Sequence, residues 1–240
     1  MIDLKTADFF IRLISFIISY FLVITIPNVV RARVSRWAGD DTPQLLGFDS
    51  LNPMHHVDPV GFIILIISSL WNSPLGWGRT VVTNPFNITS KLRLLLVYLS
   101  DIVTHFSLAL VWLILLELMF GLEVLVLFQY MVLGRSLSHV LLAQAFGTTS
   151  SLTVSIGFIL LVAIYLHVLL GVIYAILNGR DLYLVMTTKD PLAYEVARVH
   201  VSNFIIPLVL LLLFAAPLRF MVVAIISYVG FFLGLLLGLH

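Results

Sequence analysis

The chain has 240 residues, of which 61% are hydrophobic and only 10% are charged, and its mean hydropathy is +1.12. These values exclude an ordinary soluble domain and place the chain in a lipid bilayer. The net charge of +1 argues against a nucleic-acid partner, and the lack of cysteine excludes disulfides and thiolate metal sites.

The first predicted membrane span covers about residues 9–26. Arg12 lies close enough to its end to reach the headgroups, and no small-residue cleavage site follows a short apolar core. We therefore expect a retained helix rather than a signal peptide. Pro27 removes a helical hydrogen bond, which predicts a kink followed by a basic, amphipathic tail.

The middle of the chain alternates short and long apolar segments. Residues 60–71 are too short for a span and predict a buried or re-entrant segment, followed by a loop rich in Pro, Gly and Asn. The apolar run 94–133 is about twice the length of one crossing, so we expect a turn at 121–123. One span precedes this turn and a surface-lying segment follows it, with Glu117 and Glu123 among the lipid headgroups.

Two further apolar blocks complete the pattern. A span is predicted over 152–177, followed by a polar connection over 178–200. The block 203–239 is long enough for a helical hairpin that turns near Pro217, and glycines at 230, 234 and 238 are spaced for close helix approach. The sequence thus predicts a single all-α membrane domain, 1–240, with about five spans and one short buried or re-entrant segment.

The basic residues predict the orientation. Placing the connections 31–93 and 178–200 on one side of the membrane gathers nine Lys and Arg residues there and leaves four opposite. The nine are Arg31, Arg33, Arg36, Arg79, Lys91, Arg93, Arg180, Lys189 and Arg198. By the positive-inside rule this side faces the cytoplasm or its organellar equivalent.

The stretch "GFDSLNPMHHVDPVG" at 47–61 concentrates polar residues, and with "LGWGRTVVTNPFNI" after it resembles the site-2 protease (M50-type) family of intramembrane zinc metalloproteases. Bacterial members carry L-N-P-x-x-H-x-D-P-x-G and then F-G-W-A-K-P-V-P-x-N-P. The positions that match form a fold-signature loop: Asn52, Pro53, His56, Asp58, Pro59, Gly61, Gly76, Trp77, Asn84 and Pro85. In the second motif Arg79 stands for a Lys, and Thr80 and Val82 replace two prolines. The signatures are concentrated in residues 27–90.

The resemblance implies a zinc motif, H-E-x-x-H, shortly before a G-D-P-T turn. The turn is visible as "GDDT" at 39–42, which aligns the motif with "PNVVR" at 27–31. Both histidines and the glutamate are therefore replaced, by Pro27, Asn28 and Arg31. A zinc protease needs two neutral imidazoles and a carboxylate base, and an Arg cation repels a divalent ion.

Later family motifs are altered as well. The G-P-x-x-N motif falls on "DIVTH" at 101–105, and the region of the third zinc ligand falls near 174–181. Asp181 occupies the ligand position if one residue is deleted, and the family's prolines are missing.

Two polar groups have alternative interpretations. His55, His56 and Asp58 could form a metal site, but we favour a hydrogen-bonded turn, because the family's similar stretch does not carry its zinc ligands.

Asp101 and His105 lie four residues apart on one helix face within an apolar span. Together with His167 and Asp181 they could rebuild a metal or proton site. We favour pairing of Asp101 and His105 with each other or with a partner's basic residue.

The resemblance, with its zinc motif erased, implies a pseudoprotease that needs no cofactor. We expect a subunit, assembly factor or scaffold that contacts the bilayer and other integral membrane subunits, in a bacterial or organellar inner membrane. The alternative is an active membrane metalloenzyme, with zinc as its cofactor, or a proton- or ion-handling element, using Asp101, His105, His167 and Asp181. A third possibility is that it binds membrane substrates without cleaving them.

Overall fold

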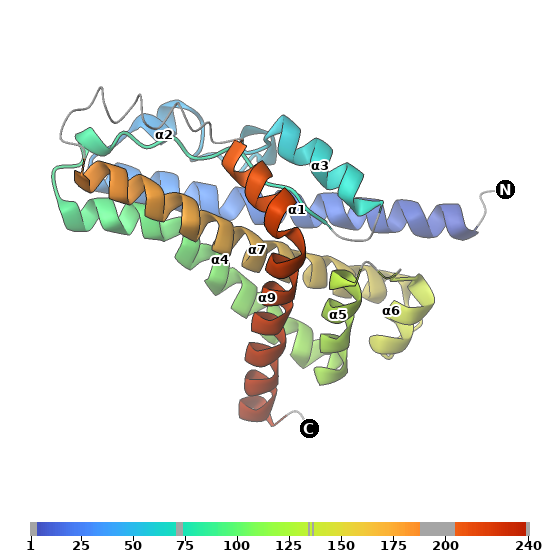
Figure 1. Ribbon diagram of the computed structural model, residues 1–240. Coiled ribbons are helices and arrows are strands. Elements are labelled where there is room, and N and C mark those ends of the chain that lie inside the picture. The colour runs from blue at the N-terminus through green and yellow to red at the C-terminus, as the bar shows by residue number, and fades with distance from the viewer. Residues whose placement is uncertain (1–3, 71–73, 134, 136, 188–204, 239–240) are drawn as a thin grey trace.

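The computed structural model describes residues 4–70, 74–133, 135, 137–187 and 205–238 (Figure 1). For residues 4–8, 132, 205–216, 218 and 219 it describes only the backbone. The long helices are α1 (Leu4–Ala38), α4 (Lys91–Phe120), α7 (Ser151–Thr187) and α9 (Ile205–Leu237). The short elements are α2 (Thr42–Leu45), η1 (Pro53–His55), α3 (Pro59–Ser69), η2 (Pro85–Asn87), η3 (Leu122–Leu125), α5 (Val126–Val132) and α6 (His139–Ala145).

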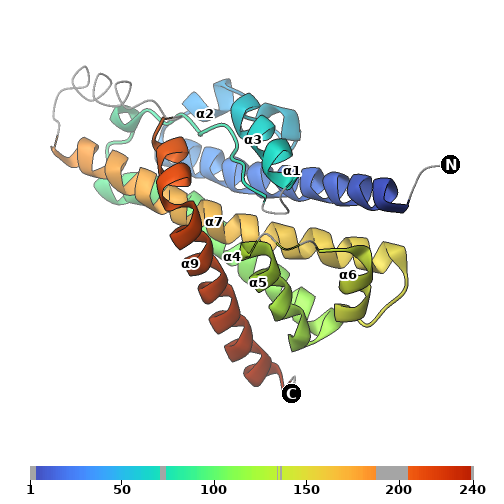
Figure 2. The same cartoon turned by 45° about the vertical axis from the view of Figure 1, so that its right-hand side comes forward.

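Helices α1, α4 and α7 run side by side, and α9 crosses α7 and α4 (Figures 1 and 2). Four helical stretches in the described part of the chain are long and apolar enough to span a membrane. These are Phe9–Ala38, Lys91–Phe120, Ser151–Thr187 and Phe220–Leu237. Of the four, α7 is the most buried, because its neighbours cover it on several sides. The chain is therefore an all-α integral membrane protein in contact with the lipid bilayer.

The first span is longer than the sequence predicted. Helix α1 does not give way to a separate tail after Ile26 but continues through Pro27 to Ala38. Val29, Ala32 and Ser35 are buried beyond the proline. Packing of this second half against the bundle offsets the backbone hydrogen bond that Pro27 cannot make.

The predicted C-terminal hairpin is wrong. Residues 205–237 form one helix, α9, with Pro217 inside it, so the described part of the chain has four candidate spans instead of about five. The ribbon of α9 changes direction along its length but does not reverse (Figures 1 and 2). A proline is tolerated inside a membrane helix because neighbouring groups satisfy the freed backbone carbonyl, so it need not produce a turn.

The third span also exceeds its predicted end at Leu177. Helix α7 continues through "NGRDLYLVMT" to Thr187, because Asn178 and Asp181 are buried and hydrogen-bonded inside the bundle. The remainder of the expected polar connection, 188–200, lies outside the described residues.

The turn predicted at 121–123 is confirmed, because Gly121 ends α4 with a φ of +77°. The segment after it packs into the helix bundle. Leu127, Phe128 and Met131 are buried, and α5 packs against α9. Glu117, expected among the headgroups, is fully buried. Sequence periodicity did not reveal α9 as the partner of this segment, because residues 220–238 carry no charge and show no single apolar face.

The short segment before the loop forms α3, an 11-residue helix beside α1. Gly61, Leu65 and Ser68 form its buried face, whereas Ile63 and Ile67 are exposed. Its length is too small to cross a bilayer, as predicted.

Candidate functional site

Arg31, which the resemblance aligns with the second histidine of the zinc motif, lies inside the three-helix core and is only 3% exposed. Its Nη1 donates to Asp101 Oδ2 at 2.8 Å and to Asn178 Oδ1 at 3.0 Å. Its guanidinium also stacks over the Tyr98 ring, with 5.2 Å from Cζ to the ring centroid. We call Arg31, Tyr98, Asp101 and Asn178 the Arg31 cluster.

The Arg31 cluster joins three helices. Asn178 of α7 donates through Nδ2 to Tyr98 O and to Asp101 Oδ1, both at 2.8 Å and both on α4. Each Asp101 oxygen therefore accepts a hydrogen bond, and the carboxylate is neutralised by Arg31 of α1. Asp101 thus has a basic partner within its own chain and does not pair with His105, which was one of the two pairings favoured from the sequence.

Two more residues stand where the resemblance places the zinc motif. Asn28, aligned with its glutamate, donates through Nδ2 to Arg79 O at 2.9 Å and holds the signature loop against α1. Pro27, aligned with its first histidine, has no side-chain donor or acceptor.

His105 and His167 form a second buried polar pair. Their Nδ1 atoms are 2.9 Å apart between α4 and α7, and the His105 ring lies 5.4 Å from the Tyr174 ring. In this hydrogen bond one Nδ1 carries the hydrogen and donates it, and the other Nδ1 accepts the bond. His167 Nε2 is buried and makes no hydrogen bond within the described part of the chain.

The structure therefore brings together two of the four residues that could rebuild a metal site. His105 and His167 meet, whereas Asp101 pairs with Arg31 and Asp181 accepts from Arg180 Nε at 2.9 Å. Among the described residues, no three His, Asp or Glu side chains converge as a metal site.

The signature loop is built from three Asx-Pro helix starts. Asp58 Oδ1 accepts from Val60 N at 3.0 Å and Gly61 N at 2.8 Å, which caps α3. Asn52 and Asn84 cap η1 and η2 in the same way, each at 3.1 Å. Proline follows each cap because the first helical position needs no N–H donor.

The extended segment around Trp77 crosses the N-terminus of α3. Arg79 N donates to His56 O at 2.7 Å, and the Tyr20 hydroxyl of α1 donates to Trp77 O at 2.9 Å. A Cβ on Gly61 would overlap the Trp77 carbonyl oxygen, and one on Gly76 would lie 2.9 Å from Gly61 O. The two signature glycines therefore allow the backbones to touch.

Asp40 has a structural role that the sequence motifs did not predict. It is fully buried, directly after Gly39, which ends α1 with a φ of +113°. Its carboxylate accepts from Asn84 N at 2.8 Å, from Asn87 Nδ2 at 2.9 Å and from the Thr42 hydroxyl at 2.6 Å. Asp40 thus ties the "GDDT" turn to the "NPFN" turn, a link between distant loops that neither motif reveals alone.

His56 of the signature loop is buried against the Phe48 ring, and its Nε2 donates to Ser50 O at 2.7 Å. Burial lowers the pKa of this imidazole below its usual value of 6.5. The hydrogen bond to Ser50 opposes this shift, and the charges of His55 and Arg79 add to it. His55 and Asp58 do not form a metal site with His56. Asp58 caps α3, and His55 Nδ1 contacts Gly47 O at 3.2 Å.

The lowered His56 pKa predicts acid sensitivity. Below about pH 6.5 the unfolded imidazole binds a proton that the folded one resists. The neutral His56 therefore contributes fully to the free energy of unfolding above that pH. This contribution is lost as the pH falls toward the lowered pKa of the folded state. Thermal unfolding in detergent should show a steeper acid loss for the wild type than for His56→Gln, which keeps a donor for Ser50 O. Parallel pH profiles would contradict the assignment.

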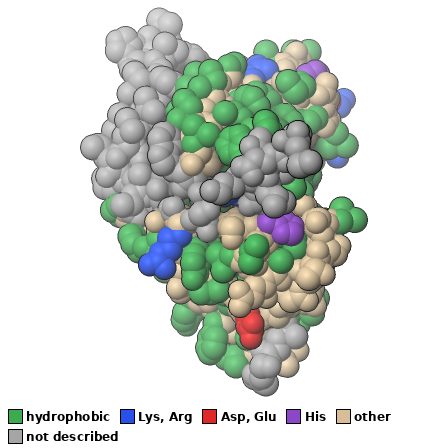
Figure 3. All heavy atoms as spheres, turned by 90° about the vertical axis from the view of Figure 1, so that its right-hand side faces the viewer, with side chains coloured by type: hydrophobic (Ala, Val, Ile, Leu, Met, Phe, Trp, Pro, Cys, Tyr) green, Lys and Arg blue, Asp and Glu red, His purple; other side chains and the backbone are tan. Residues whose placement is uncertain are grey.

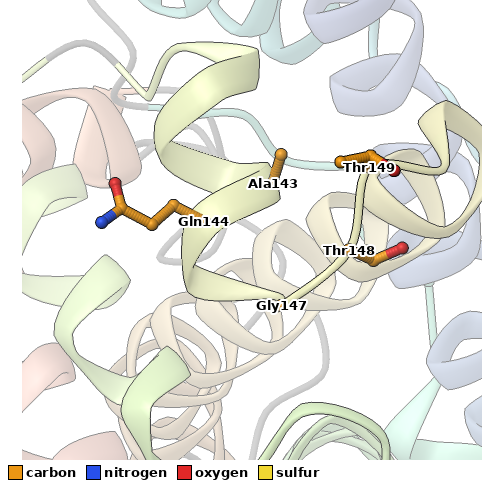
Figure 4. A pocket seen from close by; sticks show the side chains of 5 residues that line it. All are labelled: Ala143, Gln144, Gly147, Thr148 and Thr149. Carbon is orange, nitrogen blue, oxygen red and sulfur yellow. The ribbon is translucent and has the colours of Figure 1, made fainter.

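A separate open cleft of about 510 Å³ lies beside α6 and is lined by Ala143, Gln144, Gly147, Thr148 and Thr149. Gln144 extends to one side of α6, and the two threonines lie on the connection that follows (Figure 4). None of these side chains is charged, so the cleft has no acid, base or strong metal ligand.

Comparisons with known proteins give one informative match. No family model matches the chain, and no solved structure gives a significant match. Over 116 residues the chain is 31% identical to "Putative zinc metalloprotease YwhC" of Bacillus subtilis (strain 168). The aligned region covers 47% of this chain and 51% of the relative, so the chain spans about half the length of the protein it matches. The chain is therefore a distant homologue of a protein that carries the name "Putative zinc metalloprotease".

Proposed function

We propose that this protein is a catalytically inactive, site-2 protease-like membrane protein that serves as a subunit, assembly factor or scaffold of a membrane complex. The observation that carries the proposal is the Arg31 cluster, which fills the region where the zinc motif would lie. Distant homology to the "Putative zinc metalloprotease YwhC" supports the comparison with that motif.

The chemistry of the Arg31 cluster opposes proteolysis. A guanidinium has no lone pair for a metal and stays protonated, so Arg31 cannot replace a histidine ligand. Asn28 cannot accept a proton from a metal-bound water, as a catalytic glutamate would. Asp101 has both oxygens engaged, and withdrawing it to bind an ion would leave Arg31 buried without its counter-charge.

The retained features suit a scaffold. The capped signature loop and the cross-linked core of α1, α4 and α7 make a rigid framework with apolar outer faces. On α1, Ile14 and Ile18 are exposed, as are Leu110 and Leu118 on α4. Apolar side chains are interspersed with few charges on the face in Figure 3. Such faces fit lipid chains and the spans of other integral membrane subunits, including a substrate helix that is bound without being cleaved.

We infer that the signature loops face the cytoplasm or its organellar equivalent, in a bacterial or organellar inner membrane. The surplus of basic residues in the connections supports this orientation even without Arg31, which is buried and paired inside the bundle. Because the chain has no cysteine, a single Asp49→Cys variant can report from which side an impermeant maleimide reaches the loop.

The first test is purification in a mild detergent, with metal content and co-purifying proteins measured on the same sample. We expect membrane partner subunits in fixed ratio and zinc at the level of a metal-free control protein. The matched variant carries Pro27→His, Asn28→Glu and Arg31→His, which restores the family motif. A wild-type chain that carries one zinc ion and cleaves a membrane substrate would contradict the proposal.

One observation favours a second candidate function, a proton- or metal-handling element. The His105 and His167 Nδ1 atoms lie 2.9 Å apart in the core. Ionisable side chains buried in a membrane are costly, so they usually mark a functional site. If this pair held a transition metal, the metal would disappear in His105→Ala and His167→Ala but survive in Arg36→Met. Metal content that is independent of both histidines would exclude it.

A further inference from the structure

Glu117 is a buried carboxyl group that the proposed function does not use. It lies in the last turn of α4 and is 0% exposed. Neither carboxyl oxygen has a hydrogen-bond partner among the described residues. The two other acids within the helical core, Asp101 and Asp181, are both paired with arginines, so Glu117 requires a separate explanation.

Helix α9 forms the cover over this carboxyl group. A Cβ on Gly230 would lie 2.6 Å from Glu117 Oε1 and 2.8 Å from Leu125 Cδ2, so the α9 backbone lies directly against the acid. One helical turn later, Gly234 receives the side chain of Leu122 in the same manner. The glycines thus provide a flat strip on α9 for Glu117 of α4 and for Leu122 and Leu125 of η3.

The surroundings select the ligand of Glu117. A hard cation needs several oxygen ligands, whereas no three His, Asp or Glu side chains converge in the described part of the chain, and the α9 backbone at Gly230 lies against Oε1. A basic side chain would have to enter a site that is closed to solvent. A proton needs no other ligand and removes the charge, which is very costly to bury unpaired.

No charged group in the described part of the surrounding elements compensates an ionised Glu117. Glu123 of η3 and Tyr228 of α9 are exposed, and Tyr130 of α5 is stacked by Arg135. Residues 151–164 of α7 include no titratable side chain. Arg219 precedes Gly230 by 11 positions on α9, or about 16 Å along a helix.

We propose that Glu117 is an intramembrane proton-binding site that controls the docking of α9. With its proton bound, the neutral carboxyl lies against Gly230 and α9 is closed over α4 and η3. Loss of the proton creates a charge that only water or a cation can stabilise, so α9 must move away to admit one. The position of α9 on the bundle thereby follows the availability of protons on the side of the membrane where α4 ends. This inference does not depend on whether the protein is a pseudoprotease.

The proton itself can be tested with dicyclohexylcarbodiimide, an apolar reagent that adds to protonated carboxyl groups in membranes. Native membranes containing the full chain are treated at a series of pH values, and the modified peptide is identified by mass spectrometry. The reagent enters from the lipid during transient openings of α9, so we expect label on Glu117 that declines with the protonated fraction as the pH rises and is lost in Glu117→Gln. A labelled Glu123 with an unlabelled Glu117 at every pH would overturn the proposal.

The docking of α9 can be tested independently by disulfide formation, because the chain has no cysteine of its own. The Leu122→Cys and Gly234→Cys pair is placed in the wild-type and in the Glu117→Gln background. The cross-link yield in the wild-type background is divided by the yield in the Glu117→Gln background, which cancels the pH dependence of the thiols. We expect this ratio to fall as the pH rises. A ratio that stays constant would overturn the control of α9, whether or not Glu117 is labelled.

Discussion

Replacing Arg31 by methionine is expected to destabilise the protein by about 3–5 kcal/mol, the usual cost of removing one partner from a buried ion pair. The side chains of Arg31 and Asp101 are each only 4% exposed, so the variant would leave Asp101 buried without its counter-charge. Unfolding by heat or by a denaturing detergent should show a large loss relative to the wild type.

Two variants separate the buried charge from other effects at Arg31. The double variant Arg31→Met, Asp101→Leu should recover much of the stability, because it leaves no uncompensated ion. Arg36→Met removes an exposed pair, with Arg36 and Asp41 3.7 Å apart and about two-thirds exposed, and should cost no more than about 1 kcal/mol. If Arg31→Met behaves like Arg36→Met, the Arg31 cluster does not hold the core.

Gly61→Ala is expected to produce the second large effect, a loss at the upper end of the roughly 1–3 kcal/mol found for overpacked sites. The added methyl would overlap the Trp77 carbonyl oxygen and lie 3.0 Å from Trp77 N and C. These are backbone atoms, and Tyr20 holds that same carbonyl by a 2.9 Å hydrogen bond, so the segment cannot yield by rotating a side chain.

Gly179→Ala is the matched control, because nothing lies within 4 Å of a Cβ at this position of α7. Alanine is favoured over glycine in a helix by about 0.5–1 kcal/mol, so this variant should be neutral or slightly more stable. Equal melting temperatures for Gly61→Ala and Gly179→Ala would show that the contact with Trp77 is not tight.

The helical membrane class, the break at Gly121 and the short segment after Pro59 could be predicted from the sequence. They depend on composition, on run length and on a residue that permits positive φ, all of which are local properties. The ends of the spans could not be predicted, because polar residues such as Asn178 extend a helix when partners in other helices satisfy them.

For the candidate site, the sequence by itself determined that Pro27, Asn28 and Arg31 stand where the resemblance places the zinc motif, because side-chain chemistry is fixed by identity. Only the tertiary structure decided what replaces that motif. It paired Arg31 with Asp101 and His105 with His167, and it placed α9 over Glu117. These partners lie on different helices, up to 113 positions apart in the case of Gly230 and Glu117. An apolar helix gives no sign in its sequence of which neighbour it will meet, because in lipid the hydrophobic pattern does not select one face over another.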